Sequence, residues 1–182
     1  FRDGFINVDS PTSPVPITIN AASINTWGAE IDWIWQPVRD LNIGLSGGWL
    51  SSRIQGNITS AGQSLDGNRP VQSPRWTFNG QFSWTPEVSS SLKLIVSGDA
   101  SWRSSQYFEA NNSPSSLEPG YWLVNGRLGF GAVDEKWSVT AFVKNLTRSN
   151  YRTYVNDLPA FGWILNIYGA PRTYGVSASV KF

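Results

Sequence analysis

Residues 171–182 read PRTYGVSASVKF, and apolar and polar side chains alternate there without a break to the last residue. The apolar positions are Tyr174, Val176, Ala178, Val180 and Phe182, and small or polar residues fill the places between them. A repeat of two places successive side chains on opposite faces of a β-strand. The stretch therefore predicts a strand with one apolar and one polar face that ends on an aromatic ring.

The same alternation occurs in six further segments. They cover residues 26–37, 41–50, 75–86, 91–103, 121–130 and 136–145, and residues 1–8 predict an eighth strand with a less regular pattern. Each clear segment has about ten residues, the length that a tilted strand needs to cross a bilayer. No run approaches the roughly 20 apolar residues of a membrane helix, so the sequence favours crossing with strands.

The connections between these segments alternate in length. Residues 36–40, 85–90 and 132–135 are tight turns, whereas residues 10–23, 52–74, 103–120 and 148–171 are long polar stretches. Strictly alternating short and long connections are typical of an up-and-down outer-membrane barrel, with short periplasmic turns and long external loops. By this parity, we expect Phe182 to end at the periplasmic interface.

Aromatic residues on the apolar faces gather at both ends of the segments. Trp27, Trp49, Trp76, Trp102 and Trp122 lie at the loop ends, and Trp35, Trp84, Phe130, Trp137 and Phe182 lie beside tight turns or at the terminus. Two aromatic bands around an aliphatic middle suit the two interfaces of a membrane, because the indole ring of tryptophan is amphipathic. The sequence predicts an all-β, antiparallel, transmembrane β-barrel whose aromatic girdle contacts the lipid of a bacterial outer membrane.

The composition argues against several other functions. The chain contains no histidine and no cysteine, and its formal net charge is +1. A catalytic triad and a thiolate metal site lack their usual residues, and no basic surface suits nucleic acid. Glu30 and Asp32 are interpreted as polar residues of a barrel wall rather than as a catalytic pair. We therefore expect no enzyme, no cofactor, no metal site and no nucleic-acid partner.

Several stretches follow the order of features in one known family. GAEIDWIWQP (28–37) resembles a Gly-x-Glu strand of that family, and GNRPVQSPRWTFNGQFSW (67–84) resembles its glycine-containing loop with a proline before the next strand. WSVTAFVKNLTRSNY (137–151) carries an Asn-Leu…Tyr signature at Asn145, Leu146 and Tyr151, and residues 170–182 resemble the final Pro-Arg-x-Tyr strand. The chain thus resembles the C-terminal part of a TonB-dependent outer-membrane receptor.

The resemblance implies a barrel of 22 strands that an N-terminal plug domain fills and a TonB box couples to the inner membrane. Residues 1–182 then form about eight C-terminal strands, without plug or TonB box, and the start at Phe1 is expected to follow a removed leader or a longer protein. The implied function is energy-coupled uptake of a scarce ligand, most often a ferric siderophore, otherwise cobalamin or an oligosaccharide. The implied partners are the rest of the receptor, the TonB complex and the barrel-assembly machinery, which would read Tyr174, Val176, Val180 and Phe182.

Two loops are rich in aromatic residues and predict the ligand-facing surface. The candidate ligand contacts are Tyr107, Phe108, Arg152, Tyr154, Trp163 and Tyr168. Aromatic rings with arginine suit an anionic, ring-bearing siderophore or stacked sugars. The alternative is that these rings extend the outer girdle or pack one loop on another.

Two other functions remain open on sequence alone. One is a complete small eight-stranded outer-membrane barrel with a structural or adhesive role, and the weaker one is a soluble, tryptophan-rich sugar-binding module. A complete barrel must pair its first strand with its last, whereas a piece of a larger barrel leaves both edges free.

Overall fold

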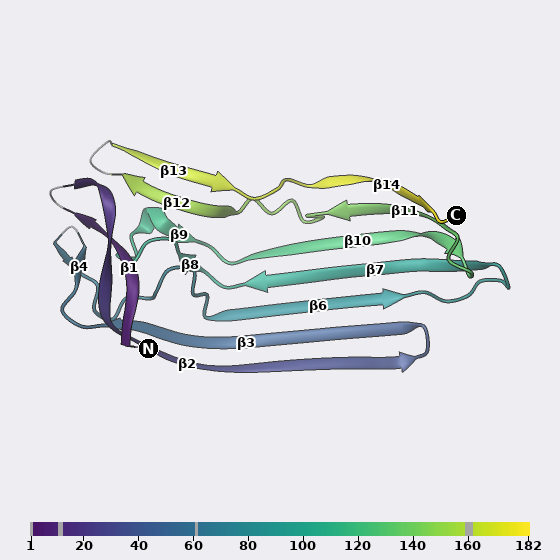
Figure 1. Ribbon diagram of the computed structural model, residues 1–182, viewed down its shortest axis with the longest axis horizontal. Coiled ribbons are helices and arrows are strands. Elements are labelled where there is room, and N and C mark those ends of the chain that lie inside the picture. The colour runs from purple at the N-terminus through teal and green to yellow at the C-terminus, as the bar shows by residue number, and fades with distance from the viewer. Residues whose placement is uncertain (1, 11–12, 61, 159–161) are drawn as a thin grey trace.

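The computed structural model describes residues 2–10, 13–60, 62–158 and 162–182, and it is built almost entirely of strands (Figure 1). The main sheet contains, in spatial order, β1 (Arg2–Ser10), β2 (Ser13–Val38), β3 (Leu41–Gln55), β6 (Trp76–Trp84), β7 (Leu92–Arg103), β10 (Tyr121–Ala132), β11 (Trp137–Lys144) and β14 (Thr173–Val180). All of its neighbouring strands are antiparallel. No helix among the described residues is long and apolar enough to cross a membrane.

Three small hairpins lie at one end of this sheet. They are β4 (Thr59–Ser60) with β5 (Gln63–Ser64), β8 (Gln106–Tyr107) with β9 (Leu117–Glu118), and β12 (Arg152–Leu158) with β13 (Trp163–Tyr168). A single 3₁₀ turn, η1 (Pro114–Ser116), lies between β8 and β9. Figure 1 shows these pieces together at one end of the long strands, the loop end, and the tight turns and the C-terminus at the other, the turn end.

The seven predicted strands with clear alternation are confirmed, and so are the tight turns. Between β2 and β3, Val38 pairs with Leu41, and the register slips between Trp35 and Val38, where Pro37 lies. Proline has no N–H to donate to the ladder, so a bulge at the strand end is where a sheet tolerates it. At the adjacent turn, the backbone N–H of Thr85 donates to the carbonyl of Asp40 at 2.9 Å.

The prediction of a long loop over residues 10–23 is wrong. Residues from Ser13 onward already belong to β2, and β1 pairs along them, from Arg2 opposite Ser23 to Ser10 opposite Ser13. The β-branched run Ile17, Thr18 and Ile19 favours extended backbone, and pairing with β1 completes the strand. β1 consequently lies beside only the outer part of β2, beyond the stretch that β2 shares with β3.

The sheet is open rather than closed. In the part of the chain that the structure describes, β1 and β14 are the two edges and do not pair with each other. The alternative of a complete small barrel is therefore wrong, because such a barrel needs that pairing to leave no edge.

Strand register lines up the apolar side chains across one face of the sheet. At the loop end, the rings of Trp49 and Trp76 lie 6.3 Å apart, those of Phe78 and Trp102 lie 5.7 Å apart, and those of Trp102 and Trp122 lie 6.2 Å apart. These contacts join four neighbouring strands through a chain of rings. Aromatic pairs at such distances contribute about 0.5–1.5 kcal/mol each beyond the area they bury.

The same face carries smaller side chains between its aromatic ends. Ala100 pairs with Gly80 on one side and with Val124 on the other. Gly80 lies midway between Trp76 and Trp84 along β6. Many large apolar side chains of this face are exposed, Ile31 to 71% and Tyr174 to 78%. A wide exposed apolar face with aromatic ends is what lipid contact requires.

Glycines on this face make room for aromatic rings. A Cβ at Gly98 would come within 2.8 Å of the Phe82 ring, and a Cβ at Gly47 would come within 3.3 Å of the Phe78 ring. Each ring therefore lies over the backbone of the neighbouring strand, where a side chain would displace it.

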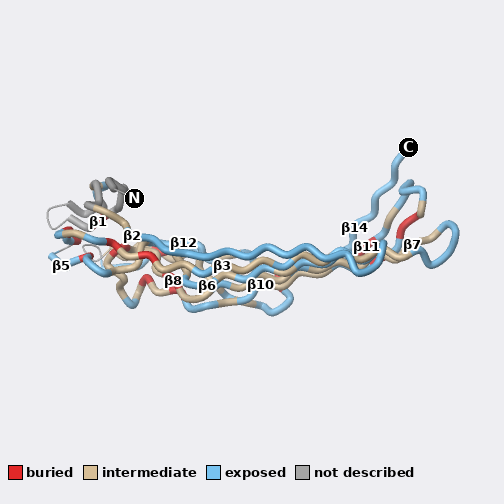
Figure 2. Tube along the Cα trace, turned by 90° about the horizontal axis from the view of Figure 1, so that it is seen from below, coloured by how far each residue is buried: buried red, intermediate tan, exposed pale blue. Residues whose placement is uncertain are grey.

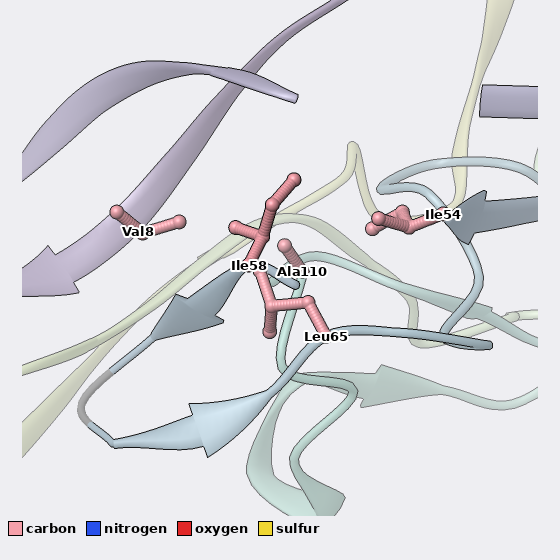
Figure 3. Close-up of a cluster of buried hydrophobic side chains, with 5 residues drawn as sticks. All are labelled: Val8, Ile54, Ile58, Leu65 and Ala110. Atoms are coloured by element: carbon pink, nitrogen blue, oxygen red, sulfur yellow. The ribbon is translucent and has the colours of Figure 1, made fainter. Parts of the chain in front are cut away.

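The buried hydrophobic cluster lies at the loop end of the molecule. Val8, Ile54, Ile58, Leu65 and Ala110 form one buried cluster where β1, the end of β3 and two loops meet (Figure 3). Figure 2 shows buried residues towards the ends of the molecule, and exposed or half-buried residues along the middle of the strands. The middle of the sheet is one layer thick, so its two faces must be covered by something other than this segment.

The two faces give a direct test of the wall. Ala100→Arg places a charge at the middle of the apolar face, and we expect it to lower the free energy of unfolding by about 2–4 kcal/mol, as such charges do in lipid-facing barrel positions. Ser101→Arg is the matched control, because Ser101 pairs with Asn79 and Leu123 on the opposite face. Urea unfolding of the protein in lipid vesicles measures both changes. Equal losses would contradict the assignment of faces.

Candidate functional site

The face opposite the aromatic bands is mainly polar across β2, β3, β6, β7 and β10. One row of paired residues crosses five strands through Glu30, Gly48, Thr77, Arg103 and Tyr121. The next rows carry mainly serine, asparagine, glutamine and glycine. Glu30 and Asp32 lie on this face, as the sequence predicted, in a row of wall residues.

A hollow of about 650 Å³ lies over the polar face, where Gln81, Asp99, Asn125, Arg127 and Lys144 contribute to its lining. The Asn125 side chain donates a hydrogen bond to the Asp99 carboxylate at 2.7 Å and accepts one from the backbone N–H of Asn145 at 3.0 Å. Acidic, basic and amide groups thus share the lining of the hollow. The described residues also contain no group of three metal-ligating side chains.

The side chains of Arg103, Tyr121 and Tyr151 meet at the loop end of the polar face. The sequence predicted none of them as a ligand contact, and Tyr151 was named only for the Asn-Leu…Tyr signature. The rings of Tyr121 and Tyr151 stack with their centroids 4.7 Å apart, and the guanidinium of Arg103 lies 5.5 Å from the centre of the Tyr121 ring. Alternation along β7 and β10 could have placed Arg103 and Tyr121 on the same face, because both occupy polar positions at the loop ends of their strands. The stack of Tyr151 could not be predicted, since it depends on the path of the loop.

The β12–β13 hairpin brings together two of the predicted ligand contacts. Pairing of Tyr154 with Ile167 and of Leu158 with Trp163 places these side chains on one face, with Leu165 between them. Tyr154 and Trp163 are 43% and 50% exposed, and Ile167 is 49% exposed. We call these residues, Tyr154, Trp163, Leu165 and Ile167, the outer hairpin face.

Arg152 and Tyr168 lie on the opposite face of the same hairpin. They pair with each other, and Tyr168 shares its side of β13 with Asn166. Arg152 forms an ion pair with Glu118 at 2.7 Å, and its side chain is 18% exposed. All contacts that the structure shows for Arg152 are within the loops, and its role in ligand binding stays a prediction.

Tyr107 and Phe108 are half-buried between loops. The guanidinium of Arg69 lies 4.8 Å from the centre of the Tyr107 ring, and the backbone N–H of Phe108 donates to the carbonyl of Ser116 at 3.0 Å. The contact of Tyr107 with Arg69 corresponds to the alternative weighed above, in which an aromatic residue packs one loop on another, whereas the backbone bond of Phe108 stays within its own loop. The structure thus places the six candidates in three settings: exposed Tyr154 and Trp163 on the outer hairpin face, Arg152 and exposed Tyr168 on the opposite face, and half-buried Tyr107 and Phe108 in the loop of residues 103–120.

Asn145 fixes the stem of the loop that carries the hairpin. Its side-chain amide donates to the carbonyls of Ser149 and Ala170 at 2.9 and 3.1 Å, and its side-chain oxygen accepts from the N–H of Ser149 at 2.9 Å. Its backbone has a φ of 50°, a region that asparagine tolerates better than most residues. The Asn-Leu…Tyr signature therefore has a structural reason: Asn145 joins the two ends of the loop.

A protein-family model described as TonB dependent receptor-like, beta-barrel matches residues 1–146. The chain belongs to this family. Its members are outer-membrane receptors and transporters rather than enzymes, which agrees with the predicted location and with the prediction of no enzymatic activity. No match was found among curated proteins.

Solved receptor structures share the fold of this segment. The ferric yersiniabactin uptake receptor FyuA from Yersinia pestis matches with a TM-score of 0.76 and 19% identity, over 91% of this chain and 25% of that one. BauA, the ferric preacinetobactin receptor from Acinetobacter baumannii, matches with a TM-score of 0.69 and 23% identity, over 99% and 26%. PiuA, a siderophore receptor from the same organism, matches with a TM-score of 0.70 and 17% identity, over 97% and 24%.

These matches confirm the fold class, because the open sheet superimposes on part of a much larger barrel. The segment spans about a quarter of each of these receptors. At this level of identity, the likeness shows the fold and leaves the ligand of this receptor segment undecided.

The stem at Asn145 is open to a two-part test. Asn145→Ala removes the side-chain bonds and keeps the strained backbone, so we expect the free energy of unfolding to fall by about 2–4 kcal/mol. Asn145→Gly also loses the bonds but relaxes the backbone, and its loss should be smaller by about 1 kcal/mol. Urea unfolding measures the difference, with Asn150→Ala at an exposed asparagine of the same loop as control; equal effects of alanine and glycine would exclude the strain.

Proposed function

We propose that residues 1–182 form the C-terminal barrel segment of a receptor that takes up a ferric siderophore by energy-coupled transport. The observation that carries this proposal is the two-faced open sheet, apolar with aromatic ends on one side and polar on the other. Such a sheet suits a wall between lipid and a lumen through which cargo passes. Three receptors that share the fold are named for ferric siderophores or siderophore uptake, which supports this cargo class over cobalamin or oligosaccharide.

The wall needs partners on both sides. We propose that outer-membrane lipid covers the apolar face and that the remaining strands and the plug of the same receptor cover the edges and the hollow near Asp99 and Arg127. Coupling to the TonB complex would belong to the part of the receptor that carries the plug. The plug would have to move away from the polar face during transport. Charged and amide groups on that face suit such movement, because no large apolar contact would hold the plug in place.

The exposed end of β14 supports a further partner in assembly. Tyr174, Val176 and Val180 all lie on the apolar face of the edge strand and are exposed, as is Phe182. An edge strand with unpaired backbone groups and an apolar stripe is a template for strand addition. We propose that the barrel-assembly machinery recognises this strand.

Ligand contact is proposed at the loop end of the polar face and on the outer hairpin face. Tyr154 and Trp163 offer exposed rings, and Arg103 beside Tyr121 offers a cation at the mouth of the wall. Aromatic stacking and a nearby guanidinium suit the aryl rings and anionic groups of a ferric siderophore. Tyr107, Phe108, Arg152 and Tyr168 remain predictions from sequence, and none of them lies on the outer hairpin face.

Transport is tested in cells that carry or lack this receptor. We expect radioactive iron to accumulate from at least one member of a panel of ferric siderophores only when the receptor is present, and to stop when the proton gradient is collapsed. Labelled cobalamin and maltooligosaccharides serve as the competing cargo classes. Uptake of one of these in place of iron would overturn the siderophore assignment and leave the receptor fold intact.

The outer hairpin face is tested by comparing exposed rings. Trp163→Ala and Tyr154→Ala are each expected to weaken binding of the transported ferric siderophore roughly two- to twelvefold, since a stacked ring contributes about 0.5–1.5 kcal/mol. Tyr168→Ala removes an exposed ring from the other face and is the matched comparison. Equilibrium binding to the purified receptor measures all three, and equal losses would show that this face has no special role.

A further inference from the structure

Arg152 lies where the β12–β13 hairpin passes the loop that contains β8, η1 and β9. Its Nε donates to Glu118 Oε2 at 2.7 Å, and its backbone N–H donates to Glu118 Oε1 at 3.1 Å. Glu118 is only 5% exposed, and both of its carboxylate oxygens are thereby bound. A carboxylate this deeply buried is tolerated only when a counterion and donors are held in place.

The rest of the Arg152 guanidinium joins further parts of the two loops. Nη1 donates to the carbonyl of Ser115 at 2.9 Å and to the side-chain oxygen of Asn166 at 3.2 Å, and Nη2 donates to the carbonyl of Leu117. The Arg152 side chain therefore joins its own strand, β12, to Asn166 of β13 and to three residues of the neighbouring loop. A planar guanidinium with five donors can make such a set of bonds, whereas lysine cannot.

A second polar connection lies further along the same strand. Asp157 accepts a hydrogen bond from the Ser115 hydroxyl at 2.7 Å, and its backbone N–H donates to Glu109 at 2.6 Å. Val155, between the two connections, is 2% exposed. The face of β12 opposite the outer hairpin face is thus packed against residues 109–118 along its length.

The loop of residues 103–120 is joined in turn to the loop of residues 52–74. The Asn112 side chain donates to the carbonyl of Arg69 and accepts from its backbone N–H, both at 2.9 Å, and Arg69 Nη1 donates to the carbonyl of Ser105 at 3.0 Å. Asn68 donates to the carbonyl of Ala110 at 3.0 Å, and Ala110 belongs to the buried cluster of Figure 3. Polar and apolar contacts both cross this second junction.

We propose that the described parts of three external segments, residues 52–60 and 62–74, residues 103–120, and residues 152–158 and 162–168, open and close as one body, and that Arg152 is the positioning residue that joins the outer hairpin face to it. Separating the hairpin alone would leave Glu118 buried without its counterion and the carbonyls of Ser115 and Leu117 without donors. Each of those losses is unfavourable, so partial separation is disfavoured relative to movement of the whole set. The proposal does not depend on which ligand the receptor carries.

Hydrogen exchange of the full receptor in detergent, read by mass spectrometry, tests this proposal. Arg152→Met is expected to speed exchange roughly 100-fold both in residues 152–158 and in residues 106–118, because it strands a buried carboxylate. Glu118→Met in the same chain removes that carboxylate, and the double variant should recover most of the protection. Arg148→Met, at an exposed arginine of the same loop, is the control and should change neither segment.

Three outcomes would overturn the proposal. They are faster exchange confined to the hairpin, no change in Arg152→Met, and a double variant no better protected than Arg152→Met. If Arg152→Met does not fold, exchange of the unmodified receptor decides the question across a series of low urea concentrations. Residues 65–72, 106–118 and 152–158 should then share one opening reaction with the same dependence on urea, and separate dependences would show independent loops.

Discussion

The structure depends on one constraint: inside hydrocarbon, every backbone N–H and C=O must find its partner in a neighbouring strand, because no water is available. β7 and β10 show how this is met, with pairs running without interruption from Arg103 and Tyr121 to Leu92 and Ala132. Once the ladder is continuous, the two-residue repeat assigns each side chain to the lipid or to the lumen. The aromatic rows, the polar wall and the placement of Pro37 at a bulge all follow from keeping that ladder intact.

A wall of this kind has no interior of its own, so its buried side chains gather elsewhere. Val8, Ile54 and Leu65 lie beneath the external loops, which behave in this respect like a small water-soluble domain resting on the strands. Two solvents therefore shape one chain. Lipid permits the sheet to expose tryptophan and leucine, whereas water at the loop end requires a compact cluster and paired charges such as Arg152 with Glu118.

The strands and their faces could be predicted from the sequence because alternation is a local property. β10 and β14 can each be recognised from the alternation within about ten residues. β1 was predicted as the eighth strand, but the start of β2 was missed because its residues lack alternation and contain Pro14 and Pro16, and only pairing with β1 shows that they are strand. The site was harder still. The Arg152 guanidinium is held by Glu118, which is 34 residues away in the sequence. This contact fixes which face of the hairpin turns towards the neighbouring loop, and so leaves Tyr154 and Trp163 exposed on the other face. Residue type alone suggested the same role for all of them.

The stem at Asn145 has a consequence for how such receptors diverge. Its amide holds Ser149 and Ala170 together, so the chain between them leaves and re-enters the wall at a fixed place. Natural variation can alter that intervening stretch without disturbing the strands on either side. The neighbouring loop limits this freedom, because a new hairpin must still satisfy Glu118. Descendants that acquire a different hairpin are expected to change position 118 in the same lineage, so the two loops should be inherited as a pair.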